Sequence, residues 1–283
     1  MSKYKVSIFE CLGLKPFRKT LKASKLAIFG DKYTPKTKAD LTTLRQYKPK
    51  ISIPLWKGKL PLERTIIITN LYNYKQPNVK EGWSVRVTNV EDFRGKSLTY
   101  DSHNGTDFSL PPGYSVTAPA PGKVLRISSE FNRGGLKIFI DHGQGIITTL
   151  NHLSKTLVKV NDIVKRGQEI AISGYSGIDA ILAFPFSPPH VHFNVWLNGE
   201  YVDPFAKDNG ISIWRNYNNP IPTKEEDLND DNYIETEFNK EAFKEALKNI
   251  IDDNIEEDIL SKKNIFRKMY EYNFLYELLP LAF

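Results

Sequence analysis

The sequence predicts a mainly β protein with a basic N-terminal extension and a helical C-terminal appendage, and three observations support this prediction. Between about residues 64 and 210, short β-branched and apolar runs alternate with Gly, Pro, Asn and Asp turns. No stretch of that region keeps a 3.6-residue apolar repeat. The region before it is rich in lysine, and after Pro222 the pattern becomes helical.

Composition is that of an ordinary globular protein. The chain has 283 residues, of which 40% are hydrophobic and 25% charged, and this length suits one or two domains. We expect a basic region with short strands over 1–95, the β domain over 96–210, and an acidic linker with two helices over 211–283. Cys11 is the single cysteine, which excludes an internal disulfide.

Six segments of the β region have the composition of strands and are bounded by turns. They are 65–70, 83–88, 122–127, 136–140, 145–150 and 190–197. In 1–70, scattered prolines and weak periodicity predict only short strands and loops. In the C-terminal region, 232–251 places its apolar residues on one helical face, and 255–278 predicts a second helix that ends before Pro280.

Charge is distributed unevenly along the chain, whose formal net charge is +6. Residues 1–70 contain 16 basic and four acidic residues, whereas 221–283 contain eight basic and 16 acidic residues. The basic N-terminal region could contact an anionic polymer such as teichoic acid, or a lipid surface. Attraction between the two ends, or solvation of both, is the simpler explanation because the lysines form no dense block. We expect no nucleic-acid partner.

Patterns of signal peptides and membrane spans leave the cellular location of the protein open. The first thirty residues contain no apolar run of signal-peptide length, and no later segment approaches the roughly 18 apolar residues of a membrane span. We therefore expect no transmembrane segment and leave the location open.

The histidines are the strongest functional signal. All five lie within 90 consecutive residues. In a strand, His190 and His192 would point to the same face, about 6.6 Å apart along the chain. One could bind a metal and the other could contact a metal-bound water, although a surface strand that happens to carry two histidines has the same pattern.

A second pair, His103 and Asp107, has the spacing HxxxD. A fully extended chain would place these residues about 13 Å apart, too far for two ligands of one zinc ion, so the chain must bend between them. Gly105 supplies permissive backbone for that bend. Two histidines and one aspartate suit zinc and leave a fourth position for water, as in a catalytic site.

Seven ordered segments now match a known family. They are H-N-G-T-D-F (103–108), V-T-A-P-A-P-G-K-V (116–124), D-H-G-Q-G (141–145), T-L-N-H-L-S (149–154), V-K-V-N-D-I-V-K-R-G-Q-E-I (158–170), P-H-V-H-F (189–193) and V-D-P (202–204). This third of the chain resembles the lysostaphin/LytM-type zinc endopeptidases, bacterial enzymes that cut peptide cross-links in peptidoglycan. The resemblance implies an antiparallel, sandwich-like β-sheet and one zinc ion per chain.

Carried over position by position, the resemblance implies that His103, Asp107 and His192 bind the zinc. It implies that His152 and His190 lie beside the zinc-bound water, move its proton and stabilise the oxyanion, without dividing these roles between them. We interpret His142 as structural.

The chain departs from the family pattern in four places, of which Ala171 for a usual glycine and Leu150 for a common tyrosine are the milder two. Asn161 replaces a usual glycine, which a left-handed turn tolerates. The loop 177–189 is longer and more apolar than usual and borders the HxH strand, so we expect it to reshape one wall of the substrate groove.

The main hypothesis is therefore a zinc-dependent endopeptidase that hydrolyses peptide bonds of peptidoglycan stem or cross-link peptides. One alternative is a non-enzymatic regulator or cell-wall-binding module that retains the fold. A phosphocarrier with two facing histidines is a third reading, and the His103–Asp107 pair argues against it. The resemblance favours the cell envelope or secretion, whereas the sequence alone favours the cytoplasm.

Overall fold

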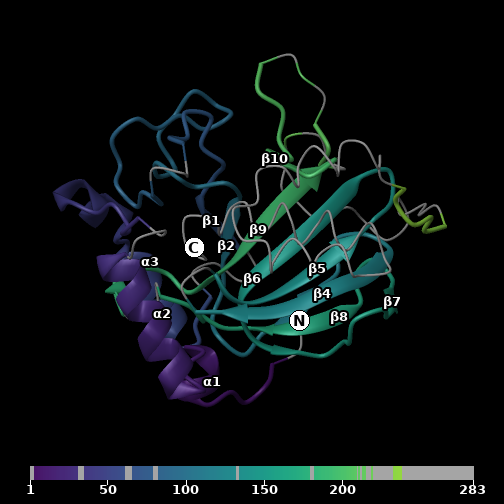
Figure 1. Cartoon of the computed structure of the whole chain (residues 1–283), viewed down its shortest axis with the longest axis horizontal. Helices are drawn as coiled ribbons and strands as arrows, with labels where there is room; N and C mark the ends of the chain where they lie inside the picture. The colour runs from purple at the N-terminus through teal and green to yellow at the C-terminus, as the bar shows by residue number, and fades with distance from the viewer. Residues whose placement is uncertain are drawn as a thin grey trace, which may run out of the picture.

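The structure is a computed structural model that describes residues 3–30, 35–60, 66–78, 82–131, 134–178, 182–208, 210, 212–214, 218 and 232–237. Ten strands of the described residues form one antiparallel sheet, which confirms the mainly β prediction (Figure 1). None of the described helices is long and apolar enough to cross a membrane. The helices predicted over 238–278 lie outside the described residues.

The sheet has one continuous path of strands with a smaller branch. The path runs β1 (Ile67–Asn70), β2 (Thr106–Ser109), β9 (His190–Leu197), β6 (Ile146–Thr156), β5 (Gly135–Asp141), β4 (Gly122–Glu130) and β7 (Ile163–Val164). β10 (Glu200–Val202) pairs with β9, while β8 (Glu169–Ser173) pairs with β3 (Ser115–Thr117) and with the far end of β6. β6 and β9 therefore lie at the centre, where each has partners on both sides.

Alternation along β9 separates the core from the site. Val191, Phe193 and Val195 are buried in the main apolar cluster, together with residues of β3, β5 and β8, which gives the body its sandwich-like core. The residues that alternate with them along the strand, such as His192 and Asn194, must then point to the other face of the sheet. One strand therefore contributes to both the core and the candidate site.

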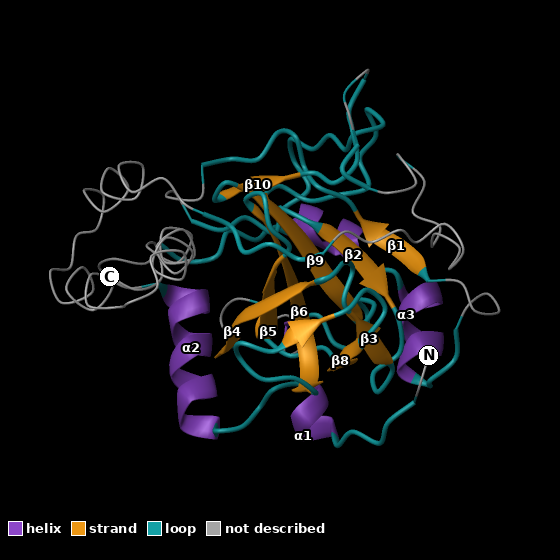
Figure 2. Ribbon diagram, turned by 90° about the vertical axis from the view of Figure 1, so that its right-hand side faces the viewer, coloured by secondary structure: helices purple, strands orange, loops and turns teal. Residues whose placement is uncertain are grey.

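The N-terminal region differs from the prediction of short strands and loops, which is wrong for four helical segments among the described residues of 1–60. This part contains the helices α1 (Ile8–Cys11), α2 (Phe17–Phe29) and α3 (Pro49–Trp56) and the 3₁₀ helix η1 (Leu41–Gln46). They gather beside one end of the sheet (Figure 1), and Figure 2 shows α2 and α3 on different sides of the body. α2 buries only Thr20 and Ala27, so it has no large apolar stripe on its packed face that periodicity could detect.

Two further segments differ from their predicted structure. Residues 83–88 form no strand and have one isolated bridge, at Ser84. Their segment packs against the loop that contains Asp101, because Ser84 and Thr88 donate hydrogen bonds to the Asp101 carboxylate. Residues 232–237, predicted as the start of a helix, form an extended segment. Thr236 and Tyr233 hold that segment by hydrogen bonds to Asp141.

Candidate metal centre

The register of the sheet brings the predicted ligands together. Asp107 of β2 pairs with His192 of β9, and Asn70 of β1 pairs with Asp107 on its other side. His103 belongs to the turn that leads into β2, and its backbone amide and carbonyl are fixed by Tyr100 and Asn73. Two strands and one turn, separated by up to 89 positions in the chain, thus face one small volume.

Gly105 is needed for space rather than for an unusual backbone angle. Its φ does not lie in the left-handed region, so the proposed reason for the glycine is corrected. A Cβ atom there would lie 2.4 Å from the Phe193 carbonyl oxygen and 2.8 Å from His192 Nε2. The glycine therefore lets the turn before β2 approach β9 closely enough for His103 to meet His192.

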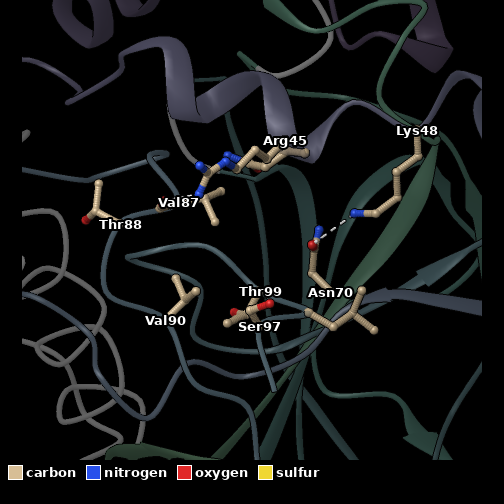
Figure 3. A pocket seen from close by; sticks show the side chains of 10 residues that line it. Arg45, Lys48, Asn70, Val87, Thr88, Val90, Ser97 and Thr99 are labelled. Atoms are coloured by element: carbon tan, nitrogen blue, oxygen red, sulfur yellow. Dashed lines mark hydrogen bonds between the residues drawn. The ribbon is translucent and has the colours of Figure 1, made fainter. Parts of the chain in front are cut away.

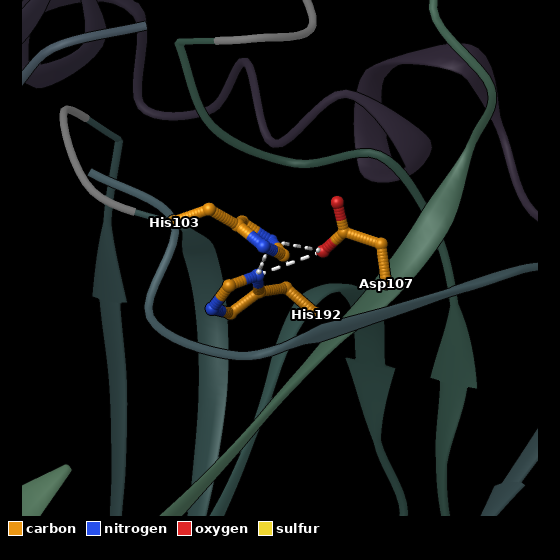
Figure 4. A group of neighbouring side chains, drawn as sticks. All are labelled: His103, Asp107 and His192. Atoms are coloured by element: carbon orange, nitrogen blue, oxygen red, sulfur yellow. Dashed lines mark hydrogen bonds and ion pairs between the residues drawn. The ribbon is translucent and has the colours of Figure 1, made fainter. Parts of the chain in front are cut away.

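The three side chains form a group that can hold a metal ion (Figure 4). The distances are 3.0 Å from His103 Nε2 to Asp107 Oδ1, 2.8 Å from His192 Nδ1 to the same oxygen, and 3.1 Å between the two ring nitrogens. Two ligands about 2.1 Å from one tetrahedral zinc ion lie about 3.4 Å apart. The observed triangle is only slightly smaller.

Hydrogen bonds at the far sides of both rings explain why these particular atoms converge. His103 Nδ1 donates to the Leu71 carbonyl oxygen at 2.6 Å, and His192 Nε2 lies 2.9 Å from Asn194 Nδ2 and 3.2 Å from Asn104 Oδ1. The bond to Leu71 leaves the lone pair of His103 Nε2 directed at the Asp107 carboxylate, and in the tautomer in which His192 Nε2 donates to Asn104 the lone pair of His192 Nδ1 is directed there as well. In that tautomer three acceptors meet, which repel one another unless a cation lies between them, so the donor set fits zinc.

Burial of His192 and the neighbours of Asp107 keep these two side chains in the protonation states that metal binding needs. Burial lowers the pKa of His192 to about 4, so this ring is neutral at pH 7. Burial alone would raise the pKa of the Asp107 carboxyl, but the neighbouring His103 and His190 hold it well below its ordinary value. A carboxylate and neutral imidazoles are the forms that bind a metal.

His152 and His190 lie beside the triangle, with ring centroids 4.7 Å apart. Each donates through Nδ1 to a backbone carbonyl oxygen, His152 to Ser176 and His190 to Pro188, both at 2.8 Å. His190 Nε2 lies 3.6 Å from Asp107 Oδ1. Burial lowers the pKa of His152 well below its ordinary value, so its ring can accept a proton but does not hold one at pH 7. The structure thus brings all five predicted residues into one cluster.

His142 is outside this cluster. Its Nδ1 donates to the Pro121 carbonyl oxygen at 2.7 Å, and its Nε2 lies 2.8 Å from Thr148 Oγ1. Both ring nitrogens therefore link β-strand ends, in agreement with the structural interpretation.

Sequence reasoning missed the asparagines that surround the ligands. Asn194 donates to the backbone and side-chain oxygens of Asn104 at 2.8 and 3.0 Å, and this fixes the partner of His192. Asn70 donates to Asp107 Oδ2 at 2.7 Å. Asn194 could have been found because it continues the His190–His192 face of β9, whereas no local pattern marks Asn70.

The site opens into a pocket of about 800 Å³. Its floor includes Asp107, His152, His190 and His192. One wall comes from residues 35–47 of the N-terminal region, and another comes from Ile178, Leu182, Ala183 and Ser187 of the long loop. The loop therefore does border the groove, as expected, and α3 supports it through hydrogen bonds from the Ser52 hydroxyl to the Pro185 and Ser187 carbonyl oxygens.

Comparison with known proteins gives this site a family. The model of peptidase family M23 matches residues 101–204, which include all five clustered residues. Residues 101–204 form an M23 peptidase domain. The match lies inside the predicted 96–210 range, whose exact limits remain a prediction.

Two relatives that match this part of the chain are named as a metalloprotease and as a peptidoglycan endopeptidase. A protein of Haemophilus influenzae described as an uncharacterized metalloprotease is 38% identical over 104 residues, which are 37% of this chain and 20% of the relative. The peptidoglycan DD-endopeptidase ShyB of Vibrio cholerae is 37% identical over 106 residues, 38% of this chain and 23% of the relative. The chain thus spans less than a quarter of either curated relative.

A solved structure extends the comparison. A zinc-containing peptidase from Vibrio cholerae is 31% identical, with a TM-score of 0.37, over 50% of this chain and 37% of that chain.

Proposed function

We propose that this M23 domain is a zinc-dependent endopeptidase that hydrolyses peptide bonds in peptidoglycan stem or cross-link peptides. The observation that carries the proposal is the convergence of His103 Nε2, His192 Nδ1 and Asp107 Oδ1 within 3.1 Å of one another, beside two further imidazoles that line a large open pocket. A zinc ion held by His103, Asp107 and His192 would polarise the scissile carbonyl and lower the pKa of water.

The remaining histidines supply the proton transfers. With Nδ1 of each ring committed to a backbone carbonyl, Nε2 is the atom of His152 and of His190 that exchanges protons with substrate or water. One of the two rings accepts the proton of the attacking water, and the pair stabilises the oxyanion and returns a proton to the leaving amine. The ring of His152 is neutral at pH 7, so its Nε2 lone pair is available to the proton of the attacking water.

The groove supports a peptide rather than a small molecule as substrate. It is long enough to involve the N-terminal region, the sheet face and the loop 182–187, and it mixes polar with apolar lining residues. The peptidoglycan part of the proposal comes from the printed names of relatives such as ShyB. A substrate of this class places the protein in the cell envelope.

Digestion of purified peptidoglycan by the full chain, with and without a chelator, tests the proposal. Mass spectrometry should detect cleaved cross-links or stems with new amino termini, and the chelator should abolish them. A zinc-loaded protein that releases no fragment, while still binding peptidoglycan, would instead favour a non-enzymatic wall-binding module. The His192→Ala variant serves as the matched inactive control.

A further inference from the structure

The second carboxylate oxygen of Asp107 has a partner from outside the M23 domain. Oδ1 points to the two ligand histidines, while Oδ2 accepts a 2.7 Å hydrogen bond from Asn70 Nδ2. Asn70 is the last residue of β1, and the β1–β2 register places it opposite Asp107. Because Asp107 is buried, this hydrogen bond controls how its carboxylate is turned.

Lys48 in turn contacts the other end of the Asn70 amide. Its Nζ lies 3.0 Å from the Thr69 carbonyl oxygen and 3.4 Å from Asn70 Oδ1 (Figure 3). An amide whose oxygen faces an ammonium group presents its NH₂ to the opposite side, where Asp107 lies. Lys48 and Asn70 both line a cavity of about 290 Å³ next to the main pocket.

Lys48 is itself held in place by the loop that walls the groove. It immediately precedes α3, and its backbone N–H donates to the Phe186 carbonyl oxygen at 3.0 Å. The chain of contacts therefore runs from the loop through Lys48 and Asn70 to a metal ligand.

We propose that Asn70 is a positioning residue of the metal centre, held by Lys48, and that the N-terminal region completes a site that residues 101–204 only partly contain. The proposal rests on the metal centre proposed above. The hydrogen bond from Asn70 to Asp107 Oδ2 keeps the other carboxylate oxygen, Asp107 Oδ1, directed at the metal position. Without this donor, the carboxylate turns and a buried oxygen loses its partner.

Zinc affinity of the full-length protein tests the role of Asn70. It is measured by competition with a chromophoric chelator, so the readout does not depend on catalysis. The Asn70→Ala variant should bind zinc about 10- to 100-fold more weakly than the wild type. The Asn70→Val variant, whose side chain favours an extended strand, should show the same loss and guards against poor folding of the alanine variant.

The Thr236→Ala variant is the matched control. Thr236 is buried and its hydroxyl donates to Asp141 Oδ1 at 2.6 Å, at the end of the sheet far from the ligands. This variant should lower the thermal midpoint while leaving zinc affinity unchanged. If the Asn70 variants bind zinc as tightly as Thr236→Ala, Asn70 has no positioning role.

Substitution of Lys48 tests whether this residue acts through Asn70 or only through its charge, because the two cases change zinc affinity in opposite directions. Removing a positive charge near a cation site would, by Coulomb's law alone, tighten zinc binding. If Lys48 acts through Asn70, Lys48→Met should instead weaken binding several-fold and have little further effect in an Asn70→Ala background. The exposed Lys50→Met variant is the charge control.

Failure of this inference is distinguishable from failure of the proposed function. A wild-type protein that binds no zinc overturns both. A wild-type protein that binds zinc, with tighter binding in Lys48→Met, overturns the role of Lys48 and leaves the peptidase proposal intact.

Discussion

At the residue scale, the candidate site depends on where each imidazole places its proton. His103 and His192 direct different ring nitrogens, Nε2 and Nδ1, toward Asp107, because the other nitrogen contacts Leu71 in His103 and Asn104 and Asn194 in His192. The motif spacing could predict that these two histidines and Asp107 meet. It could not predict Asn70, because that residue comes from a strand 37 positions earlier and carries no signature of its own.

Substitution of one ligand should remove the metal without removing the fold. The wild type should contain about one zinc per chain, and His192→Ala close to none, by elemental analysis of the purified protein. His142→Ala is the matched control, because it removes two structural contacts and should keep the zinc. Zinc retained in His192→Ala would contradict the ligand assignment.

Substitution of His152 or His190, which lie beside the proposed ligands, should lower peptidase activity without removing the zinc. His152→Ala and His190→Ala should keep their zinc but lose about 10²- to 10⁴-fold in peptidase activity, the usual contribution of a general acid or base. Parallel zinc analysis and peptidoglycan digestion check this. Full activity in both variants would rule out the proposed proton transfers.

Asp203 makes stability depend on pH. Burial raises the pKa of its carboxyl to about 7, above the 3.8 of an exposed aspartate. The folded state therefore keeps a proton that the unfolded state loses, so this stability is fully present below about pH 4 and disappears as the pH rises to about 7. Asp203→Asn should match the wild type at pH 4 and exceed it at pH 8 by on the order of 4 kcal/mol, because each pKa unit corresponds to about 1.4 kcal/mol. Urea unfolding at both pH values measures this, and equal stabilities at pH 8 would contradict it.

At the element scale, β2 and β9 set the geometry of the site through one close approach. Gly105 lies against the β9 backbone, and a methyl group at this position would overlap the Phe193 carbonyl oxygen. Next to this contact, the antiparallel register pairs Thr106 with Phe193 and Asp107 with His192.

Gly105→Ala should therefore separate the turn from β9. We expect a loss of stability of about 1–3 kcal/mol, the usual cost of overpacking, together with weaker zinc binding because His103 moves away from His192. Thermal unfolding and a zinc-binding assay, each compared with the wild type, check both effects. An unchanged thermal midpoint would mean that the backbone shifts without cost.

Sequence patterns predicted the long strands and missed the short elements. The predicted segments 122–127, 136–140, 145–150 and 190–197 all lie within or overlap observed strands because each has several β-branched residues between turns. β3, β7 and β10 have only two or three residues, too few for any periodicity. α2 was missed for a different reason: it packs through small side chains, so burial leaves no apolar pattern. At Asn161, by contrast, the expected left-handed turn is present, with φ 76°.

At the scale of the whole molecule, the N-terminal region and the M23 domain share one groove. Residues 35–47 form one wall, and α3 supports the loop that forms another. The long loop and the N-terminal region therefore have a common structural role, although its effect on substrate choice remains a prediction. Contact of the basic N-terminal region with an anionic polymer also remains a prediction.

Metal removal should destabilise the whole protein. A ligand that binds only the folded state adds about 2.7 kcal/mol when its free concentration is about 100 times its dissociation constant. Excess zinc should therefore raise the thermal midpoint, and a chelator should lower it, in the wild type. His192→Ala should show neither shift in the same calorimetric scans, whereas an equal shift in this variant would point to a different zinc site.

The contact between Asp141 and residues 232–237 lies at the end of the sheet opposite to the histidine cluster. The Asp141 carboxylate accepts hydrogen bonds from Tyr233 Oη, Thr236 N and Thr236 Oγ1, so the segment is fastened where β5 ends. Along β6, the pairs Ile146–Leu197 and Asn151–His192 are five residues apart, which is about 16 Å of strand. The histidine cluster and the Asp141 contact therefore lie at opposite ends of β6, so a change of the Tyr233 or Thr236 contacts acts on the sheet far from the candidate site.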